Sequence, residues 1–429
     1  MSSRPARAGG HSCDPPRPRW RWPTSEVAPR VGARLEELWE IARGPGGGAS
    51  RLAYSKAEAQ AVRLAAGWAR EARLEPALDP HGNLWAAPAG VAGHLVSSGS
   101  HLDTVPDGGR FDGALGVVLA LEAAEALSGR AALLVCAAEE APRFGAGTIG
   151  SRLATGALDD DALAGLVDAD GVSACEARDR FVAELADLPR IDSLPLARLA
   201  VHVEVHIEQR RELHGRGARL GVVERVAVPH RHEVVVEGRA GHAGEVLMEA
   251  RADALAAAAE LVLALEQAAR AAAPPTVATV GTLRVEPGAV SVIPGRAVLG
   301  LEVRGTDAAA IARVEAALAA ASDAVAARRG VRVERRLLRG GDPVILDAGL
   351  VQAALAAAER RAARAVRTYS GAGHDAQHLA SRVQVALLFV PLAGGESHTP
   401  EEHATTEDVE LATAVLVDMM AASVLEQPD

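Results

Sequence analysis

The sequence predicts an α/β fold made of a larger domain, with a mixed, largely parallel sheet between helices, and a smaller α+β domain inserted into it. Strands alternate with helices over the first half of the chain, a pattern typical of layered α/β domains. A separate series of strand, helix, two strands, helix and strand follows before the first pattern resumes. With 429 residues, 49% of them hydrophobic, the chain is long enough for two or three domains and a large core.

The elements of the larger domain follow from local patterns. Helical patterns cover residues 31–43 and 56–73, and the glycine-rich loop GPGGGAS separates them. The elements expected next are a strand at 81–89, a strand at 94–105, a helix at 112–127 and a buried strand at 130–140. In segment 197–209, polar residues such as His202 and Glu204 alternate with valines, which predicts a strand with two different faces.

The inserted domain is expected to begin with the strand-like segment 231–244. Its two helices are predicted from Arg251 to about Ala272 and from Asp307 to Arg329, and its other strands at 276–286, 297–305 and 331–338. The larger domain then resumes and ends with a helix after Thr406. At the other end, residues 1–30 are rich in proline and arginine and are expected to form a disordered extension. The larger domain takes residues 31–227 and, after the insert (228–338), residues 339–429.

Composition argues against several classes of protein. A formal net charge of −11 disfavours nucleic-acid binding, and no apolar run is long and charge-free enough to span a membrane. Cys13, Cys136 and Cys175 form no C-x-x-C pair, so a reducing, cytoplasmic location is expected. Cys136 lies in an apolar strand and is predicted to be a buried, inert thiol.

Imidazoles and carboxylates collect at the ends of predicted strands or in the loops that follow them. They are His101, Asp112, Glu139, Glu140, His206 and His398. In open α/β sheets this edge is where sites form. Such ligands suit Zn²⁺, or Mn²⁺ where carboxylates predominate, and five ligands with one bridging carboxylate would suit two ions.

The same region contains a competing pattern. Gly145-Ala-Gly147-Thr-Ile-Gly150 matches the G-x-G-x-x-G of a dinucleotide-binding loop. However, EEAPRF separates these glycines from the preceding strand, Pro142 disturbs the tight turn, and two carboxylates would repel a pyrophosphate. We therefore expect the glycines to turn the chain and the glutamates to carry the chemistry.

Several longer motifs together resemble one family. They are SGSHLDTVPDGGRFDGALGV, EEAPRF followed by GSR, HIEQ, GHAG with RADAL, GAGHDA and SHTPEE. In this combination the chain resembles the dinuclear-metal amidases of the hydantoinase/carbamoylase family, from about Leu35 to the last helix. The resemblance implies a catalytic larger domain, an inserted lid or dimerisation domain, and a homodimer. It also implies hydrolysis of a linear carbamoyl or amide C–N bond in a small carboxylate-bearing substrate, first an N-carbamoyl-L-amino acid and second a ureido acid such as allantoate.

The resemblance further implies roles for individual residues. The cofactors would be two divalent ions, Zn²⁺ or Mn²⁺, with His101 and His206 on one, Glu140 and His398 on the other, and Asp112 bridging both. The catalytic residues would be Glu139 as general base, Asp103 orienting His101, and His242 donating to the oxyanion, typically across a dimer. The substrate-binding residues would be Gln209, Arg304 and Ser291. His374 and Asp375 would lie near the site, whereas His202, His230, His232 and His403 are interpreted as structural or surface histidines.

Several substrate-side positions depart from the family pattern. Glu245-Val246-Leu247 replaces Thr-Thr-Pro, Arg210 replaces glycine, and Ser291 stands where the family has asparagine, while every metal position is intact. Two alternatives therefore stay open: an aminoacylase or dipeptidase of the same fold, and a non-catalytic binding protein derived from it.

Overall fold

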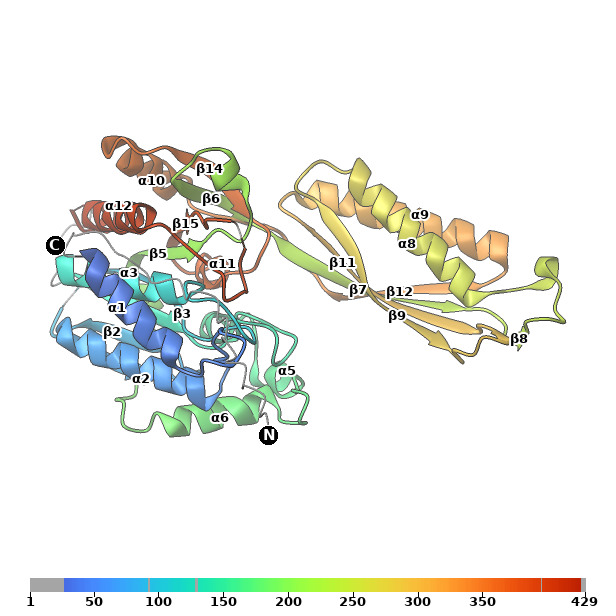
Figure 1. The fold of residues 1–429 in the computed structure, drawn as a ribbon, viewed down its shortest axis with the longest axis horizontal. Helices are drawn as coiled ribbons and strands as arrows, with labels where there is room; N and C mark the ends of the chain where they lie inside the picture. Colours follow the sequence, from blue (N-terminus) through green and yellow to red (C-terminus); the bar gives the residue numbers. More distant parts are fainter. Residues whose placement is uncertain (1–26, 92, 128–129, 395, 426–429) are drawn as a thin grey trace, which may run out of the picture.

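A long sheet covered by helices forms the larger domain, and an elongated smaller domain projects from it (Figure 1). The computed structural model describes residues 27–91, 93–127, 130–394 and 396–425. Most of the predicted extension, residues 1–26, lies outside this range, and Val27–Arg30 form the first turn of α1. Among the described residues, no helix is long and apolar enough to cross a membrane.

The sheet of the larger domain runs in the order β1-β2-β4-β3-β5-β15-β6-β13, with β14 also paired to β6. Its strands are β1 Leu74–Leu78, β2 Leu84–Pro88, β3 Leu95–His101, β4 Ala131–Cys136, β5 Leu199–Ile207, β6 Leu220–Val226, β13 Val344–Ile345, β14 Ala365–Ser370 and β15 Gln384–Val390. The central strands β4, β3, β5 and β15 are mutually parallel, and the flanking β2 and β6 are antiparallel to their neighbours in this run. This confirms the mixed, largely parallel sheet, and it brings the carboxyl ends of four strands to one edge.

Helices cover both faces of this sheet. They are α1 Val27–Glu40, α2 Lys56–Glu71, α3 Ala114–Ala126, α4 Ile149–Thr155, α5 Asp160–Ala164, α6 Ala174–Glu184, α7 Glu212–Gly215, α10 Ala348–Arg360, α11 Asp375–Leu379 and α12 Thr406–Leu425. The central helix α3 is apolar almost all round because it packs on β3, β4 and β5 and is covered in turn by α1 and α12. Cys136 is buried in β4, as predicted.

The smaller domain is one antiparallel sheet with two long helices on one face (Figure 1). Its sheet has the order β12-β7-β11-β9, with β7 Val228–Glu237, β9 Val277–Glu286, β11 Arg296–Gly305 and β12 Arg332–Arg339. Its helices are α8 Ala254–Ala271 and α9 Ala308–Arg329, and a two-stranded ribbon joins β8 Gly241–His242 to β10 Val292–Ile293. The predicted order of elements is the observed one, and β8 lies at the tip farthest from the larger domain (Figure 1).

The chain leaves and re-enters the larger domain at neighbouring points. Only Ala227 separates β6 from β7, and after β12 the chain returns to β13, where Val344 pairs with Val226. The domain boundary expected at 227/228 lies between β6 and β7. The boundary expected at 338/339 lies one residue before the end of β12. Both connections therefore lie side by side at the base of the insert.

Candidate metal centre

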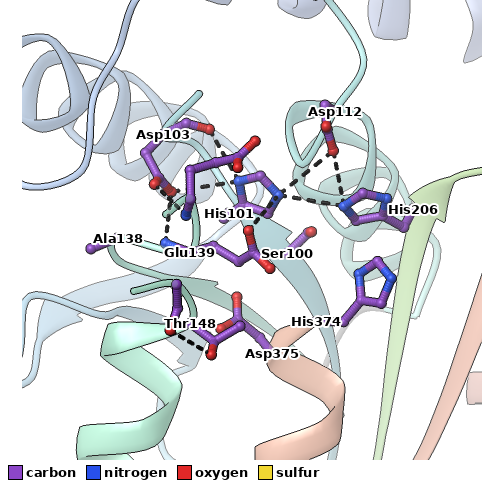
Figure 2. A network of polar contacts seen from close by, with 12 residues as sticks. Ser100, His101, Asp103, Asp112, Ala138, Glu139, Thr148, His206, His374 and Asp375 are labelled. Atoms are coloured by element: carbon purple, nitrogen blue, oxygen red, sulfur yellow. Dashed lines mark hydrogen bonds and ion pairs between the residues drawn. The ribbon is translucent and has the colours of Figure 1, made fainter. Parts of the chain in front are cut away.

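The carboxyl edge of the parallel strands gathers the predicted ligands from distant parts of the chain, and Figure 2 shows three of them, His101, Asp112 and His206. His101 ends β3, His206 lies near the end of β5, and Glu140 follows β4 by a short loop. Asp112 stands two residues before α3, and His398 comes from the segment between β15 and α12. All five lie at one place because parallel strands end at the same edge of a sheet.

Asp112 stands between two groups of possible ligands. Its Oδ1 lies 3.0 Å from His206 Nε2 and 3.8 Å from His101 Nε2, while its Oδ2 lies 3.1 Å from His398 Nε2. Glu140 Oε1 is 3.6 Å from the same His398 nitrogen. Two sets thus share Asp112, one with the two buried histidines and one with Glu140 and His398, and within each set the donor atoms lie within 4.8 Å of one another.

The hydrogen bonds of the histidines show that this centre suits a cation. His101 Nδ1 lies 3.1 Å from the carbonyl oxygen of Asp103, and His206 Nδ1 lies 3.0 Å from that of Ile207. Carbonyl oxygens only accept, so each neutral imidazole carries its proton on Nδ1 and presents a lone pair at Nε2. These two Nε2 atoms are only 3.4 Å apart. Within the described part of the chain, the buried Asp112 Oδ1 beside them accepts no hydrogen bond. Facing acceptors of this kind fit a divalent ion of the Zn²⁺ or Mn²⁺ type.

The charges of the centre perturb one another strongly. Burial opposes ionisation of Asp112, but the imidazoles of His206, His398 and His101 hold its pKa well below the usual range. Burial and repulsion from Asp112 raise the pKa of Glu140 to about 7, and the hydrogen bond to Asp112 raises the pKa of His398 to about 9. A bound divalent cation would instead favour ionised carboxylates and neutral imidazoles.

The two adjacent glutamates point to different parts of the centre. Glu139 Oε2 approaches His101 Nε2 at 3.9 Å, whereas Glu140 faces His398. Their backbone N–H groups donate to the two carboxylate oxygens of Asp103, at 3.0 and 2.8 Å. Burial raises the pKa of Glu139 well above its usual range, against the attraction of His101. Asp103 therefore holds the glutamate loop with its carboxylate and accepts from His101 Nδ1 with its carbonyl oxygen. Its Oδ1 also lies 3.5 Å from the same nitrogen.

Glycines allow the loops to pass close to these side chains. Gly113 has φ +64°, and a Cβ built on it would lie 2.4 Å from the ring of His101. A Cβ on Gly147 would lie 2.5 Å from the carbonyl oxygen of Glu139, which instead accepts a 2.7 Å hydrogen bond from Thr148 N–H. The segment that resembles a dinucleotide loop thus packs against the backbone of the glutamates.

Two buried carboxylates that have no predicted role, Glu402 and Glu58, position the loops of the centre. Glu402 accepts hydrogen bonds from the N–H groups of Phe111 (3.0 Å), Asp112 (3.2 Å) and His398 (2.9 Å). Glu58 accepts from Ala138 N–H at 2.9 Å, just before the paired glutamates, and also from the N–H of Tyr54. Glu402 could have been found in the sequence, because it belongs to the SHTPEE motif only four residues after His398.

His374 and Asp375 lie beside the centre, as the resemblance implied (Figure 2). The rings of His374 and His206 are 4.5 Å apart, and His374 Nε2 is 2.8 Å from Ser370 Oγ. Asp375 Oδ1 accepts a hydrogen bond of 2.5 Å from Ser151, and burial raises the pKa of Asp375 to about 7.

The residues predicted to contact substrate are divided between near and distant positions. Gln209 Nε2 lies 3.4 Å from His398 Nε2, at the centre. Arg304 lies at the base of the insert, where it forms an ion pair of 2.7 Å with Glu302 and donates to the carbonyl oxygen of Gly371 at 2.7 Å. His242 lies on β8, at the far tip of the insert (Figure 1), and Ser291, just before β10, accepts a 2.9 Å hydrogen bond from Ala243 N–H beside it. The single chain therefore does not bring these two residues to the centre.

Comparison with known proteins agrees with the geometry. Residues 98–422 match the sequence profile of Peptidase family M20/M25/M40. The chain is similar to an N-carbamoyl-L-amino acid amidohydrolase of Geobacillus stearothermophilus, with 35% identity over 90% of this chain and 96% of the relative. It is also 32% identical to a ureidoglycolate hydrolase of Oryza sativa, over 90% of this chain and 83% of the relative. A hydantoinase/carbamoylase family amidase from Burkholderia multivorans has a similar structure, with a TM-score of 0.82, 32% identity and coverage of 94% and 98% of the two chains.

The fold and the clustered imidazoles and carboxylates define a metal-dependent hydrolase. The chain belongs to Peptidase family M20/M25/M40, and within it to the amidohydrolases that cleave linear carbon–nitrogen bonds other than peptide bonds.

Proposed function

We propose that this protein hydrolyses the ureido or carbamoyl C–N bond of a small carboxylate-bearing substrate, with two divalent cations held by one shared carboxylate. The observation that carries the proposal is Asp112, whose two oxygens face separate ligand pairs at 3.0 and 3.1 Å. His101 and His206 would hold one ion, and Glu140 and His398 the other. When bound, such ions lower the pKa of water and polarise a scissile carbonyl.

The reaction steps fall to residues that the ligand set leaves free. Glu139 is buried beside the centre, with Oε2 3.9 Å from His101 Nε2, where its carboxylate can take a proton from the attacking water and pass it to the leaving nitrogen. The backbone N–H of Glu139 donates a hydrogen bond to the Asp103 carboxylate, which keeps Glu139 in place. Gln209, next to His398, would hydrogen-bond the polar end of the substrate.

An N-carbamoyl-L-amino acid is our first proposal for the substrate, and a ureido acid such as allantoate or ureidoglycolate is the second. Relatives named for both kinds of substrate match this chain almost equally well. Arg304 would bind the substrate carboxylate by exchanging its present partner, Glu302, for the substrate. Arg210, where the family has glycine, stacks on the ring of Tyr369 and bonds Glu212, so its guanidinium is held by other residues of the chain.

His242 would act in the centre of a partner subunit, because its position at the tip of the insert is far from the centre of its own chain (Figure 1). There it would stabilise the developing oxyanion. Mixing two inactive variants, His242→Ala and Glu139→Gln, should then restore activity, since a mixed dimer contains one centre with both groups. If the mixture of refolded or co-expressed chains stays inactive although mixed dimers form, His242 does not act across subunits.

The substrate proposal is tested with purified protein loaded with Zn²⁺ or Mn²⁺. The panel contains N-carbamoyl-L-amino acids, allantoate, ureidoglycolate, N-acetyl-L-amino acids and dipeptides, and both ammonia and free amino acid are measured. Ammonia from the carbamoyl and ureido compounds is the expected result. Release of amino acid from acyl compounds alone would favour an aminoacylase or dipeptidase. No turnover of any compound with metal bound would contradict the hydrolase proposal.

A further inference from the structure

A third group of ligand-type side chains lies outside the larger domain, at the base of the insert. It consists of His230 and His232 on β7 and Glu315 on α9, and one donor atom from each lies within 4.8 Å of the other two. From the sequence alone, His230 and His232 are expected to be structural or surface histidines. Their arrangement indicates a more specific role.

The strand and the helix bring the three side chains together by simple periodicity. His230, His232, Val234 and Val236 alternate along β7, so they share the face of the sheet that α9 covers. The two valines are fully buried in the core of the insert. The two histidines occupy the same face of β7 at its end nearer the larger domain. Glu315 follows the buried Val314 on α9 and extends toward this polar end of the row.

The carboxylate of Glu315 contacts both imidazoles of the group. Glu315 Oε1 lies 2.8 Å from His230 Nδ1 and also 2.8 Å from His232 Nε2. His230 Nε2 lies 2.9 Å from the carbonyl oxygen of Gly341, closer than the 3.3 Å to the N–H of the same residue. In a neutral His230 the proton therefore resides on Nε2, and the Nδ1 lone pair faces the carboxylate.

We propose that His230, His232 and Glu315 form a divalent-cation site of the zinc type, separate from the metal centre of the larger domain. Two imidazole nitrogens and one carboxylate oxygen are ligands that Zn²⁺ accepts in tetrahedral geometry, whereas Mg²⁺ and Ca²⁺ favour all-oxygen sets. The side chains of His230, His232 and Glu315 are 17%, 13% and 28% exposed, respectively. An ion can therefore enter, and water can take the fourth position. Tetrahedral zinc separates its ligand atoms by about 3.3 Å, so Glu315 Oε1, now 2.8 Å from each imidazole nitrogen, needs to move away by only about half an ångström.

The position of the site gives the ion a mechanical consequence. His230 stands two residues after the start of β7, on the outgoing connection, and Gly341 lies on the returning connection between β12 and β13. The hydrogen bond from His230 to the Gly341 carbonyl orients the imidazole in the way outer partners of metal ligands do. A bound ion would thus tie the start of β7 to α9 and, through the hydrogen bond of His230 to Gly341, hold the returning connection beside them.

The first test counts zinc ions per chain by equilibrium dialysis and elemental mass spectrometry. Glu315→Gln and His232→Gln should each lose one equivalent relative to the wild type, and Glu266→Gln, an exposed glutamate on α8, should lose none. Circular dichroism checks the fold of each variant. Identical zinc content in all four proteins overturns the proposal. Hydrolysis is assayed in parallel, so a wrong substrate assignment leaves the zinc count unaffected.

A second test needs no variant. Crystals of the wild-type protein grown with Zn²⁺ should give an anomalous-scattering peak at the zinc edge within about 2.2 Å of the three donor atoms. A peak at the metal centre of the larger domain with none between His232 and Glu315, at saturating zinc, would overturn the proposal even if every variant misfolds.

Discussion

Replacing Glu402 with glutamine should weaken metal binding without removing any ligand. Glu402 is 5% exposed, and its carboxylate receives three backbone N–H groups from the two segments that carry Asp112 and His398. Glutamine has one carbonyl oxygen and one NH₂ group, so it can accept on only one side. At least one buried N–H group, that of His398 or those of Phe111 and Asp112, then faces another donor.

The size of the effect follows from the lost hydrogen bond. A buried group left without its partner costs about 1–3 kcal/mol. Because these N–H groups belong to the segments that carry the proposed ligands Asp112 and His398, loss of their hydrogen bonds should also displace the ligands. Outer partners of ligands typically change metal affinity about 10- to 100-fold. We expect the dissociation constant for zinc to rise by that factor in Glu402→Gln.

The assay is a competition titration of the metal-free protein with a chromophoric zinc chelator. Glu401→Gln is the matched control, since Glu401 is the exposed neighbour of Glu402, and it should bind zinc like the wild type. If Glu402→Gln binds zinc with unchanged affinity and keeps full activity, the backbone hydrogen bonds of Glu402 do not position the ligands, and the reasoning is wrong.

Three further predictions concern the base, a glycine and a buried acid. Glu139→Gln should lower kcat about 10²- to 10⁴-fold while elemental analysis finds wild-type metal content, and retained turnover would exclude Glu139 as the base. Gly113→Ala should lower Tm and metal content, because its φ of +64° and the His101 ring 2.4 Å away leave no room for a methyl group; Gly67→Ala, with nothing within 4 Å, serves as the tolerated control in both measurements. Burial raises the pKa of Asp375 from 3.8 to about 7, so its contribution to stability is present below about pH 4 and is lost as pH rises through 7. Asp375→Asn should therefore stabilise the metal-free protein at pH 8 by at most about 4 kcal/mol in urea unfolding, with a smaller gain at pH 5, and an equal effect at both pH values would contradict the shift.

The sequence predicted the elements whose patterns are strong over their whole length. The alternation of segment 197–209 became β5, and the alanine-rich stretches became α8 and α9 within a few residues. The helix predicted at 31–43 is displaced, since α1 spans Val27–Glu40. Other elements of the larger domain were not assigned: the strands β1, β6, β13, β14 and β15 and the helices α4 to α7, α10 and α11. Most of them are short, so their patterns carry too little periodicity to stand out from their surroundings.

The candidate centre was predictable because its residues are chemically distinctive and stand at strand ends. The supporting groups were not, since Glu58 and Glu402 act on backbone N–H groups that only the folded chain brings near them. The ion pair of Arg304 with Glu302, in contrast, follows from the sequence, because residues two apart on a strand point to the same face of the sheet. The sequence could place His242 in the insert, but only the folded shape shows how far its ribbon projects (Figure 1).

The closeness of the two connections to the insert makes the protein modular. Val226 and Val344, where the chain departs and comes back, face each other across one antiparallel ladder. Everything between them can therefore be exchanged, lengthened or replaced by a short turn while the strand order beneath the metal ligands is preserved. A single scaffold of this kind can keep its metal-binding edge while a different insert, joined at the same two neighbouring points, supplies other groups to the substrate.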